Sequence, residues 1–235
     1  ARLVSDDPAK ALGKVRGRAL IGAQIAHALG NPEHALDVVS PYFIPTDEGV
    51  AAFAALRNQG VRVRVLTNSV QATDVVVVHA GYAKYRKPLL GHGVELFELR
   101  QLAPTEGQEG GRQHAAPSPL GSSGSSLHAK TFAVDGQRLF VGSFNFDPRS
   151  ALLNTEQGLV IKHPGMASEV SLSLNQYLPM LAYQVQLDDK GKLRWSAEIP
   201  EQPGQTQTFS QDPGTSWFKR AMVRVLSWLP IEGLL

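Results

Sequence analysis

No cysteine occurs among the 235 residues of the sequence. Disulfides and thiolate metal sites are therefore excluded, while the redox compartment stays open because a cysteine-free chain tolerates either environment. No run reaches the roughly 18–20 consecutive apolar residues that a membrane-spanning helix needs. The residues after Ala1 also lack the charged and then apolar pattern of a secretory signal. These absences describe this chain and leave open what a longer parent protein carries.

An excess of either charge sign is missing as well. Lysine and arginine total 23 against 21 aspartate and glutamate residues, so the net charge is +2. A charge this small gives no argument for nucleic-acid binding by itself. Hydrophobic residues make up 43% and charged residues 19%, which is ordinary for a folded soluble core. We expect one sizeable domain over 1–185, followed over 186–235 by a hairpin and an amphipathic helix.

Helical and strand patterns alternate along the chain. We expect helices over 8–29, 47–59, 74–88, 165–183 and near the C-terminus, and strands over 35–40, 61–68, 94–100 and 154–162. The strand–helix–strand order of 35–68 is typical of a βαβ unit, which favours a parallel strand pair in an α/β layer fold. Residues 103–126 are rich in Gly, Ser and Pro and contain no aromatic residue, which predicts a mobile loop.

Two chemically useful residues, His128 and Lys130, lie two positions apart in a strand-like segment. Side chains two apart on a strand point to the same face, so these two project together. Asp135-Gly136 then indicates a tight hairpin turn. A two-residue turn there, or one residue later, brings Ser143 or Asn145 beside the pair on the same face. A three-residue turn would change this parity.

These groups suit substitution at phosphorus without a metal or cofactor. Imidazole acts near neutral pH as a nucleophile or as a general acid and base. The Lys130 ammonium and the Asn145 amide are able to bind phosphoryl oxygens and stabilise charge that develops during transfer. A nucleophilic histidine needs an acceptor for its second ring nitrogen, and Glu156 on the next expected strand is the candidate.

The pattern His128-x-Lys130-x4-Asp135, followed by Gly142-Ser143-x-Asn145, resembles the HKD signature of the phospholipase D superfamily. The resemblance extends to Arg149-Ser150, Asn154 and Glu156. The segments SPYFIPTDEGV, VRVRVLTNS, HAGYAKYR and SWLPIEGLL also look like the C-terminal half of bacterial cardiolipin synthases, particularly those of the third enterobacterial type. Nearly the whole chain apart from 103–126 takes part.

The resemblance implies a phospholipase D-like layered domain, with a mixed and mostly parallel sheet flanked by helices. It implies transfer of a phosphatidyl group between phospholipids through a phosphohistidine, peripherally at the bacterial inner membrane. Phosphatidylglycerol is the implied substrate, and phosphatidylethanolamine is a candidate second lipid. A hydrolase of lipid or nucleic-acid phosphodiesters, and a non-catalytic lipid-binding half, stay open as alternatives. Because the basic residues are scattered along the sequence, we expect no nucleic-acid partner.

Such enzymes use two HKD histidines, one as nucleophile and the other as acid and base. The resemblance assigns the acid–base role to His128 and a turn-fixing role to Asp135. Because the chain holds one HxK motif, either two copies pair or a preceding N-terminal half is missing. The match to a C-terminal half favours the missing half.

Further residues have two readings each. His79, Tyr82 and Arg86 are either ordinary helix-face positions or, as the resemblance suggests, neighbours of the cleft that contact headgroup or phosphate. Arg149 is either a structural ion-pair partner or a supporting residue of the site. The aromatic and basic helix near the C-terminus either lies on an anionic membrane surface or packs on the domain.

Overall fold

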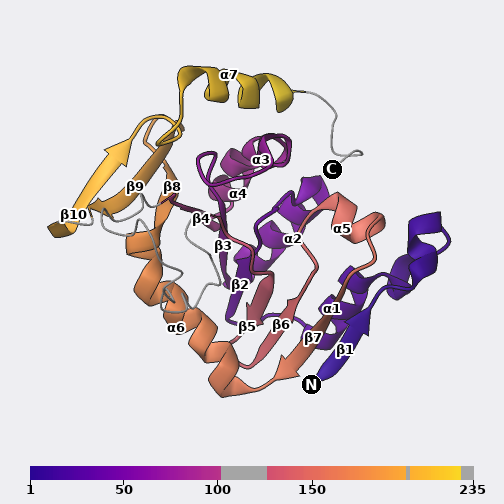
Figure 1. Ribbon diagram of the computed structural model, residues 1–235. Coiled ribbons are helices and arrows are strands. Elements are labelled where there is room, and N and C mark those ends of the chain that lie inside the picture. The colour runs from indigo at the N-terminus through magenta and orange to yellow at the C-terminus, as the bar shows by residue number, and fades with distance from the viewer. Residues whose placement is uncertain (102–125, 200–201, 229–235) are drawn as a thin grey trace, which may run out of the picture.

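The computed structural model describes residues 1–101, 126–199 and 202–228. Apart from Ser126, the loop predicted over 103–126 lies outside these residues. Within them, ten strands form one sheet in the order β1-β7-β6-β5-β2-β3-β4-β8-β9-β10 (Figure 1). The strands are β1 Arg2–Ser5, β2 Ala35–Val39, β3 Arg62–Asn68, β4 Glu95–Leu99, β5 Thr131–Val134, β6 Arg138–Gly142, β7 Gln157–Lys162, β8 Ala182–Leu187, β9 Leu193–Ile199 and β10 Gln202–Phe209. The helices are η1 Pro8–Leu12, η2 Gly17–Ala19, α1 Ile21–Leu29, α2 Thr46–Asn58, α3 Val76–Ala83, α4 Arg86–Gly91, α5 Pro148–Leu152, α6 Pro164–Leu181 and α7 Trp217–Leu226.

The centre of the sheet is parallel and its flanks are antiparallel. β2, β3 and β4 run parallel in adjacent positions, and α2 and the α3–α4 pair cross over between them, which confirms the predicted βαβ unit. The other seven pairings among the described strands are antiparallel. The α/β class with a mixed sheet is therefore confirmed. The expectation of a mostly parallel sheet is wrong, because crossover helices join only these three central strands.

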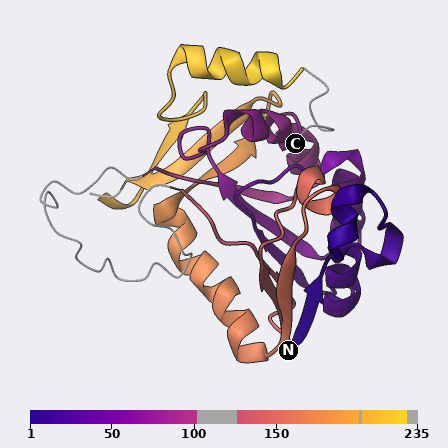
Figure 2. The same cartoon turned by 45° about the vertical axis from the view of Figure 1, so that its right-hand side comes forward.

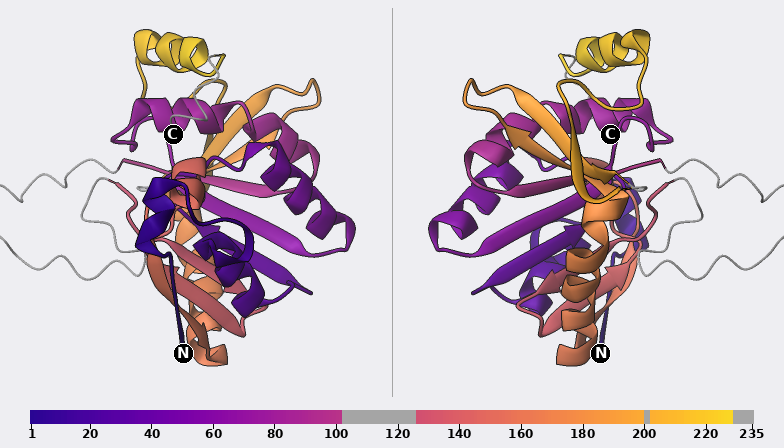
Figure 3. Two further views of the ribbon diagram at one scale, coloured as in Figure 1. Left: turned by 90° about the vertical axis from the view of Figure 1, so that its right-hand side faces the viewer. Right: turned by 90° about the vertical axis from the view of Figure 1, so that its left-hand side faces the viewer.

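Helices cover both faces of the sheet, with α1 and α6 on opposite sides (Figures 2 and 3). Side chains alternate along a strand, and two neighbours on β2 show the result. Val38 packs in the cluster that contains residues of α1 and α2, whereas Val39 packs with Leu174 and Leu178 of α6. Burial on both faces explains why the central strands have nearly continuous apolar sequences.

The N-terminal segment departs from the single helix predicted over 8–29. β1 pairs with β7, two short 3-10 helices follow, and an α-helix begins only at Ile21. Gly13 and Gly17 have φ values of 67° and 60°, a left-handed conformation that interrupts a helix. Lys10 is buried, and its Nζ donates to Asp6 Oδ2 at 2.6 Å. A buried ion pair between Lys10 and Asp6, rather than a continuous helix, therefore fixes the conformation of this segment.

The helix predicted over 74–88 is two helices, α3 and α4, with a break at residues 84–85. Pro88, expected to end the helix, lies instead in the first turn of α4. A proline is tolerated there because the backbone N–H groups of a first turn have no partner within the helix.

The C-terminal part continues the same sheet. The predicted hairpin is present as β9 and β10, and α7 forms the predicted terminal helix. β8, which the sequence did not predict, pairs with β4 and contains the proposed boundary at 185–186. The two-part division itself stays a prediction. None of the described helices has both the length and the apolar character needed to span a bilayer.

Candidate active site

The hairpin that carries the motif has a three-residue turn. Val134 pairs with Arg138, which leaves residues 135–137 as the connection. Asp135 and Gly136 both adopt left-handed backbone conformations, with φ values of 55° and 61°. The predicted two-residue turn is therefore wrong, because two successive left-handed residues and a third residue close this hairpin.

The longer turn shifts the partners of the two motif residues. Gly142 N donates to Lys130 O at 3.2 Å, so Lys130 lies opposite Gly142. If the register of β5 and β6 is continued, position 128 falls opposite 144, and not opposite Ser143 or Asn145 as predicted. The prediction from the sequence that Ser143 or Asn145 lies directly across from His128 is therefore wrong.

His128, Lys130 and Ser143 nevertheless line one open pocket of about 540 Å³. They meet because His128 and Lys130 lie in the three residues before β5 and Ser143 directly follows β6, at the same end of these two paired strands. Two paired glycines, Gly142 and Gly158, line it as well. A Cβ atom on either would lie within 2.7 Å of the Phe140 ring, so glycine is required for this close packing.

Glu156 lies beside the pocket and bonds to Ser143. Ser143 Oγ donates to Glu156 Oε2, while Ser150 Oγ and Asn154 Nδ2 donate to Oε1, each at 3.3 Å. Within the described ranges the Glu156 carboxylate makes no hydrogen bond to His128. In this arrangement the carboxylate orients the Ser143 hydroxyl rather than the imidazole.

An interior ion pair holds Glu156 from behind. Glu156 N donates to Asp6 Oδ2 at 3.1 Å, and Asp6 N donates to Glu156 O at 2.9 Å. Lys10 Nζ donates to Asp6 and, at 2.8 Å, to the carbonyl of Ser150. The N-terminal segment therefore fixes the wall of the pocket, a role that the helix prediction for 8–29 concealed.

Lys130 supplies a positive group to the pocket. Its Nζ donates to His128 O at 2.8 Å. Burial lowers the pKa of Lys130, while the carboxylates of Glu156, Asp147 and Asp74 favour its charged form. An ammonium group with carboxylate neighbours thus stands next to the histidine backbone.

Asn145 and Arg149 stand further from the pocket wall. Asn145 is buried, does not line this pocket, and its Oδ1 has no hydrogen-bond partner in the described part of the chain. Arg149 is exposed, and its Nε donates to Asn154 Oδ1 at 3.2 Å. Because Asn154 in turn donates to Glu156, Arg149 supports the carboxylate network.

His79, Tyr82 and Arg86 are interior residues, each no more than 3% exposed. Arg86 Nη2 contacts His79 Nε2 at 2.8 Å and donates to Glu98 at 3.0 Å and Asp212 at 2.7 Å. Tyr82 OH donates to the same Glu98 at 3.1 Å. Burial and mutual pairing make these three residues part of the core of the described chain, and a contact with headgroup or phosphate stays a prediction for them.

The same cluster brings His79, Glu98 and Asp212 within metal-binding reach of one another. The Arg86 guanidinium already provides the cation between them, so these residues do not fit a metal site. Because arginine only donates, His79 Nε2 accepts from it and is unprotonated. Desolvation, followed by the charge of Arg86, holds the pKa of His79 well below its ordinary value.

Asn68, at the end of β3, was missed by sequence reasoning and positions the motif. Leu127 N donates to Asn68 Oδ1 at 2.9 Å, and Asn68 Nδ2 donates back to Leu127 O at 3.4 Å. The residue before His128 is thus held on both sides of its backbone. His79 also bonds to the Asn68 backbone, so the buried cluster supports this clamp. A polar residue at the carboxyl end of a central strand was the available signal.

Asp74 was missed as well. Its carboxylate accepts from Tyr42 OH at 2.9 Å and is one of the charges that act on Lys130. Burial, followed by this hydrogen bond, raises the pKa of Tyr42 to about 12, so the phenol stays protonated.

Asp135 anchors the far end of the hairpin, as expected for a turn-fixing residue. Its carboxylate accepts from the backbone N–H groups of Glu33, His34 and Ala35 and from Arg138 Nη2 at 3.1 Å. Burial raises the pKa of Asp135, but these hydrogen bonds outweigh burial and the pKa lies below its ordinary value.

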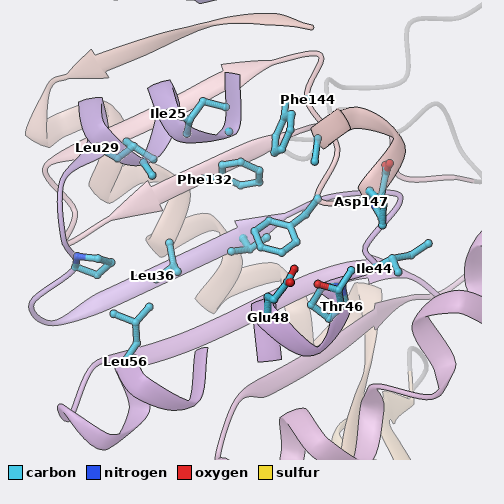
Figure 4. Close-up of a pocket in the computed structure, with 18 of the residues that line it drawn as sticks. Ile25, Leu29, Leu36, Ile44, Thr46, Glu48, Leu56, Phe132, Phe144 and Asp147 are labelled. Carbon is cyan, nitrogen blue, oxygen red and sulfur yellow. The ribbon is translucent and has the colours of Figure 1, made fainter. Parts of the chain in front are cut away.

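A second pocket, of about 480 Å³ and mostly apolar, lies between α1, α2 and the sheet (Figure 4). Phe132 and Phe144 line it together with Ile25 and Leu29 of α1, and Asp147 lies toward one end. Phe144 stands between Ser143 and Asn145 in the sequence. The loop after β6 therefore separates the polar pocket from the apolar one.

The family model described as cardiolipin synthase, phospholipase D-like domain, matches residues 25–178. The chain belongs to this family. It is 44% identical over 234 residues to cardiolipin synthase C of Escherichia coli K12, covering 100% of this chain and 48% of that protein. It is 27% identical over 159 residues to cardiolipin synthase A of Edwardsiella ictaluri, covering 68% of this chain and 28% of that protein. The chain thus spans about half the length of its Escherichia coli relative, or less for the other.

Solved structures share the fold of this phospholipase D-like domain. Nuc of Salmonella typhimurium, a phospholipase D family member, matches with a TM-score of 0.53 at 15% identity, over 79% of this chain and 98% of that one. Phosphatidylserine synthase of Haemophilus influenzae matches with a TM-score of 0.53 at 13% identity, over 91% of this chain and 43% of that one. The family resemblance drawn from the motif is therefore confirmed, together with the α/β fold.

Proposed function

We propose that this domain is the C-terminal catalytic half of a cardiolipin synthase that transfers a phosphatidyl group between phospholipids. The observation that carries the proposal is the shared pocket of His128, Lys130 and Ser143, in a domain whose family model is that of cardiolipin synthases. Phosphatidylglycerol is the proposed substrate, with phosphatidylethanolamine as a second candidate, at the bacterial inner membrane. The 44% identity to cardiolipin synthase C supports this choice of lipid.

The proposed chemistry has two substitutions at phosphorus. One histidine nitrogen attacks the phosphatidyl phosphorus, and a P–N bond forms as the P–O bond to the leaving alcohol breaks. A second histidine donates a proton to that alcohol oxygen. It then takes the proton of the incoming lipid hydroxyl, whose oxygen displaces the first histidine. We assign His128 to the second, acid–base role.

Three residues are proposed to hold the phosphoryl group. The Lys130 ammonium neutralises its charge, and the Ser143 hydroxyl, held by Glu156, contributes a polar contact at the same wall. The Asn145 amide N–H groups are the proposed donors from the loop after β6. Because water is also able to attack the intermediate, hydrolysis to phosphatidic acid is the competing outcome.

The second histidine is proposed to come from an N-terminal half of the same protein, or from a second copy of this chain. Three exposed apolar residues in register across neighbouring strands, Leu3, Leu159 and Val141, support a contact there. Leu3 and Leu159 also line the pocket of His128. An apolar surface beside half of a polar site has the composition of the centre of a protein interface.

A labelled-lipid assay tests this function. The parent protein and this chain are each incubated with labelled phosphatidylglycerol, with and without phosphatidylethanolamine, and cardiolipin and phosphatidic acid are measured. We expect cardiolipin from the parent, little from this chain alone, and none from a His128→Ala parent. Undiminished synthesis by that variant would remove His128 from the mechanism, and phosphatidic acid as the main product would favour the hydrolase. If sedimentation shows that this chain forms a tight dimer, and the dimer is active, the second histidine comes from a second copy of the chain and not from an N-terminal half.

A further inference from the structure

Helix α7 is attached to the domain through one narrow side. Val223 is buried against Val70 and Ala80, and Leu226 packs beside it. Ala80 belongs to α3, the helix against which α7 packs. This side of the helix accounts for its position along one end of the molecule (Figure 1).

The opposite side of α7 is apolar and faces solvent. Trp217 and Phe218 are 74% and 64% exposed, Val225 is also exposed, and Trp228, in the turn just after the helix, is 80% exposed. Positions 217, 221, 225 and 228 are spaced by three or four residues, so they form one stripe about half a turn away from Val223. A surface helix normally turns its apolar stripe toward the core. In α7 the aromatic stripe points outward.

The charge around this stripe has one sign. Residues 214–228 contain Lys219, Arg220 and Arg224 and no aspartate or glutamate. Arg224 is exposed at the border of the stripe, and Arg220 lies nearer the domain, where its Nη1 donates to Thr215 O. Lys219, one turn before the buried Val223, lies on the domain side of the helix instead, where its charge acts on His79 and desolvation lowers the pKa of Lys219. An apolar stripe bordered by cations matches a surface that is apolar inside and anionic at its rim.

α7 lies over α3 at one end of the molecule, and the N-terminus lies at the opposite end (Figures 1 and 3). The polar pocket lies beside the loop that leads into α5, since Ser143 is five residues before Pro148.

We propose that α7 docks the domain on an anionic phospholipid bilayer, with its outer stripe in the headgroup–acyl boundary. Interfacial helices combine Trp and Phe on one face with Lys and Arg at its border, and tryptophan prefers this depth of the membrane. Anionic headgroups then complement the exposed Arg224 and its neighbour one turn earlier, Arg220. The inference rests on the proposed function for its lipid substrate. It adds the element that brings the domain to that substrate.

Vesicle binding tests the proposal without any turnover. The full chain is sedimented with phosphatidylcholine vesicles that contain or lack phosphatidylglycerol, and tryptophan emission is recorded. We expect binding that needs the anionic lipid, with a blue shift from Trp217 and Trp228, since Trp195 is buried in either state. Trp217→Ala/Trp228→Ala should weaken partitioning by about tenfold or more, and Arg224→Glu by about tenfold.

Two controls keep the result interpretable. Leu172→Ala/Met180→Ala removes two exposed apolar side chains from α6 and should leave vesicle binding unchanged. His128→Ala should also bind as the unmodified chain does, so failure of the proposed chemistry stays separate from failure of docking. Equal binding by the double tryptophan variant, with circular dichroism unchanged, would overturn the proposal. So would self-association that the tryptophan substitutions abolish in the absence of vesicle binding, because a second copy would then cover the stripe.

Discussion

Two histidine clusters in this domain look alike in composition and differ in every physical respect. His79 lies in the core with Arg86, Glu98 and Asp212, and each of these groups has a charged or polar partner. His128 is exposed just before β5, beside Lys130 and Ser143 in an open pocket. The polar groups around His79 are bonded to one another, whereas the side chains of His128, Lys130 and Ser143 line a pocket that is open to a ligand. Availability, rather than the mere presence of histidine and charge, therefore marks the site.

Matched substitutions of the two histidines should separate these roles most strongly. We expect His128→Gln in the parent protein to lower phosphatidyl transfer by about 10²–10⁴-fold, the usual contribution of a general acid–base residue. Its thermal unfolding should barely change, because the side chain is exposed. Transfer rates and unfolding curves of His128→Gln and His79→Gln check the contrast. A rate loss in His79→Gln equal to that in His128→Gln, at unchanged stability, would contradict it.

Arg86→Met should have the largest effect on stability. Removing one partner of a buried ion pair costs about 3–5 kcal/mol, because the remaining charge stays buried without compensation. Glu98 is fully buried and would be left in that condition. Urea unfolding of Arg86→Met is compared with Arg194→Met, which removes a surface pair with Asp188 and should lower the free energy of unfolding far less. Equal losses in both variants would show that the interior cluster is not specially coupled.

Asn68→Ala probes the connection between the two clusters. Loss of both hydrogen bonds to Leu127 should cost about 1–3 kcal/mol of stability, because buried backbone groups lose their partners. Phosphatidyl transfer should fall further than the folded fraction does, since the segment that leads to His128 is released. Asn58→Ala, at the exposed end of α2, is the control. A fall in transfer that only matches the unfolded fraction would limit Asn68 to a structural role.

Local pattern was sufficient for the central βαβ unit, for most of the later elements and for the family, but it missed β1 and β8 and merged α3 with α4. The pairing register depended on one extra residue in the turn at Asp135, which the Asp-Gly pattern does not resolve. The residues that support the site, Asn68 and Asp6, could not be predicted from the sequence for a different reason. Asn68 binds Leu127 across 59 positions and Asp6 binds Glu156 across 150, and such hydrogen bonds leave no periodicity in the sequence. Burial of His79 and Arg86 was equally invisible, because buried and exposed helical faces share these residue types.

Asp135 belongs to the same motif as the exposed His128, but its carboxylate is fully hydrogen-bonded, like the groups around His79. We therefore expect Asp135→Asn to change stability rather than catalysis, and by the smallest amount of the substitutions compared here. The folded-state pKa of Asp135 is below the ordinary value of about 3.9 that we expect in the unfolded chain. Between these two pKa values the unfolded state binds more protons, so stability rises with pH there. The contribution of Asp135 to stability is therefore fully present above the unfolded pKa and is lost as the pH falls through the folded pKa.

We expect the difference in unfolding free energy between wild type and Asp135→Asn to shrink as urea titrations move from about pH 6 to pH 3. A parallel series on the exposed Asp189→Asn controls for the general acid response. A difference that stays constant over this range would place the carboxylate outside the turn network, whereas a difference confined to the transfer rate would return Asp135 to the chemistry of the motif.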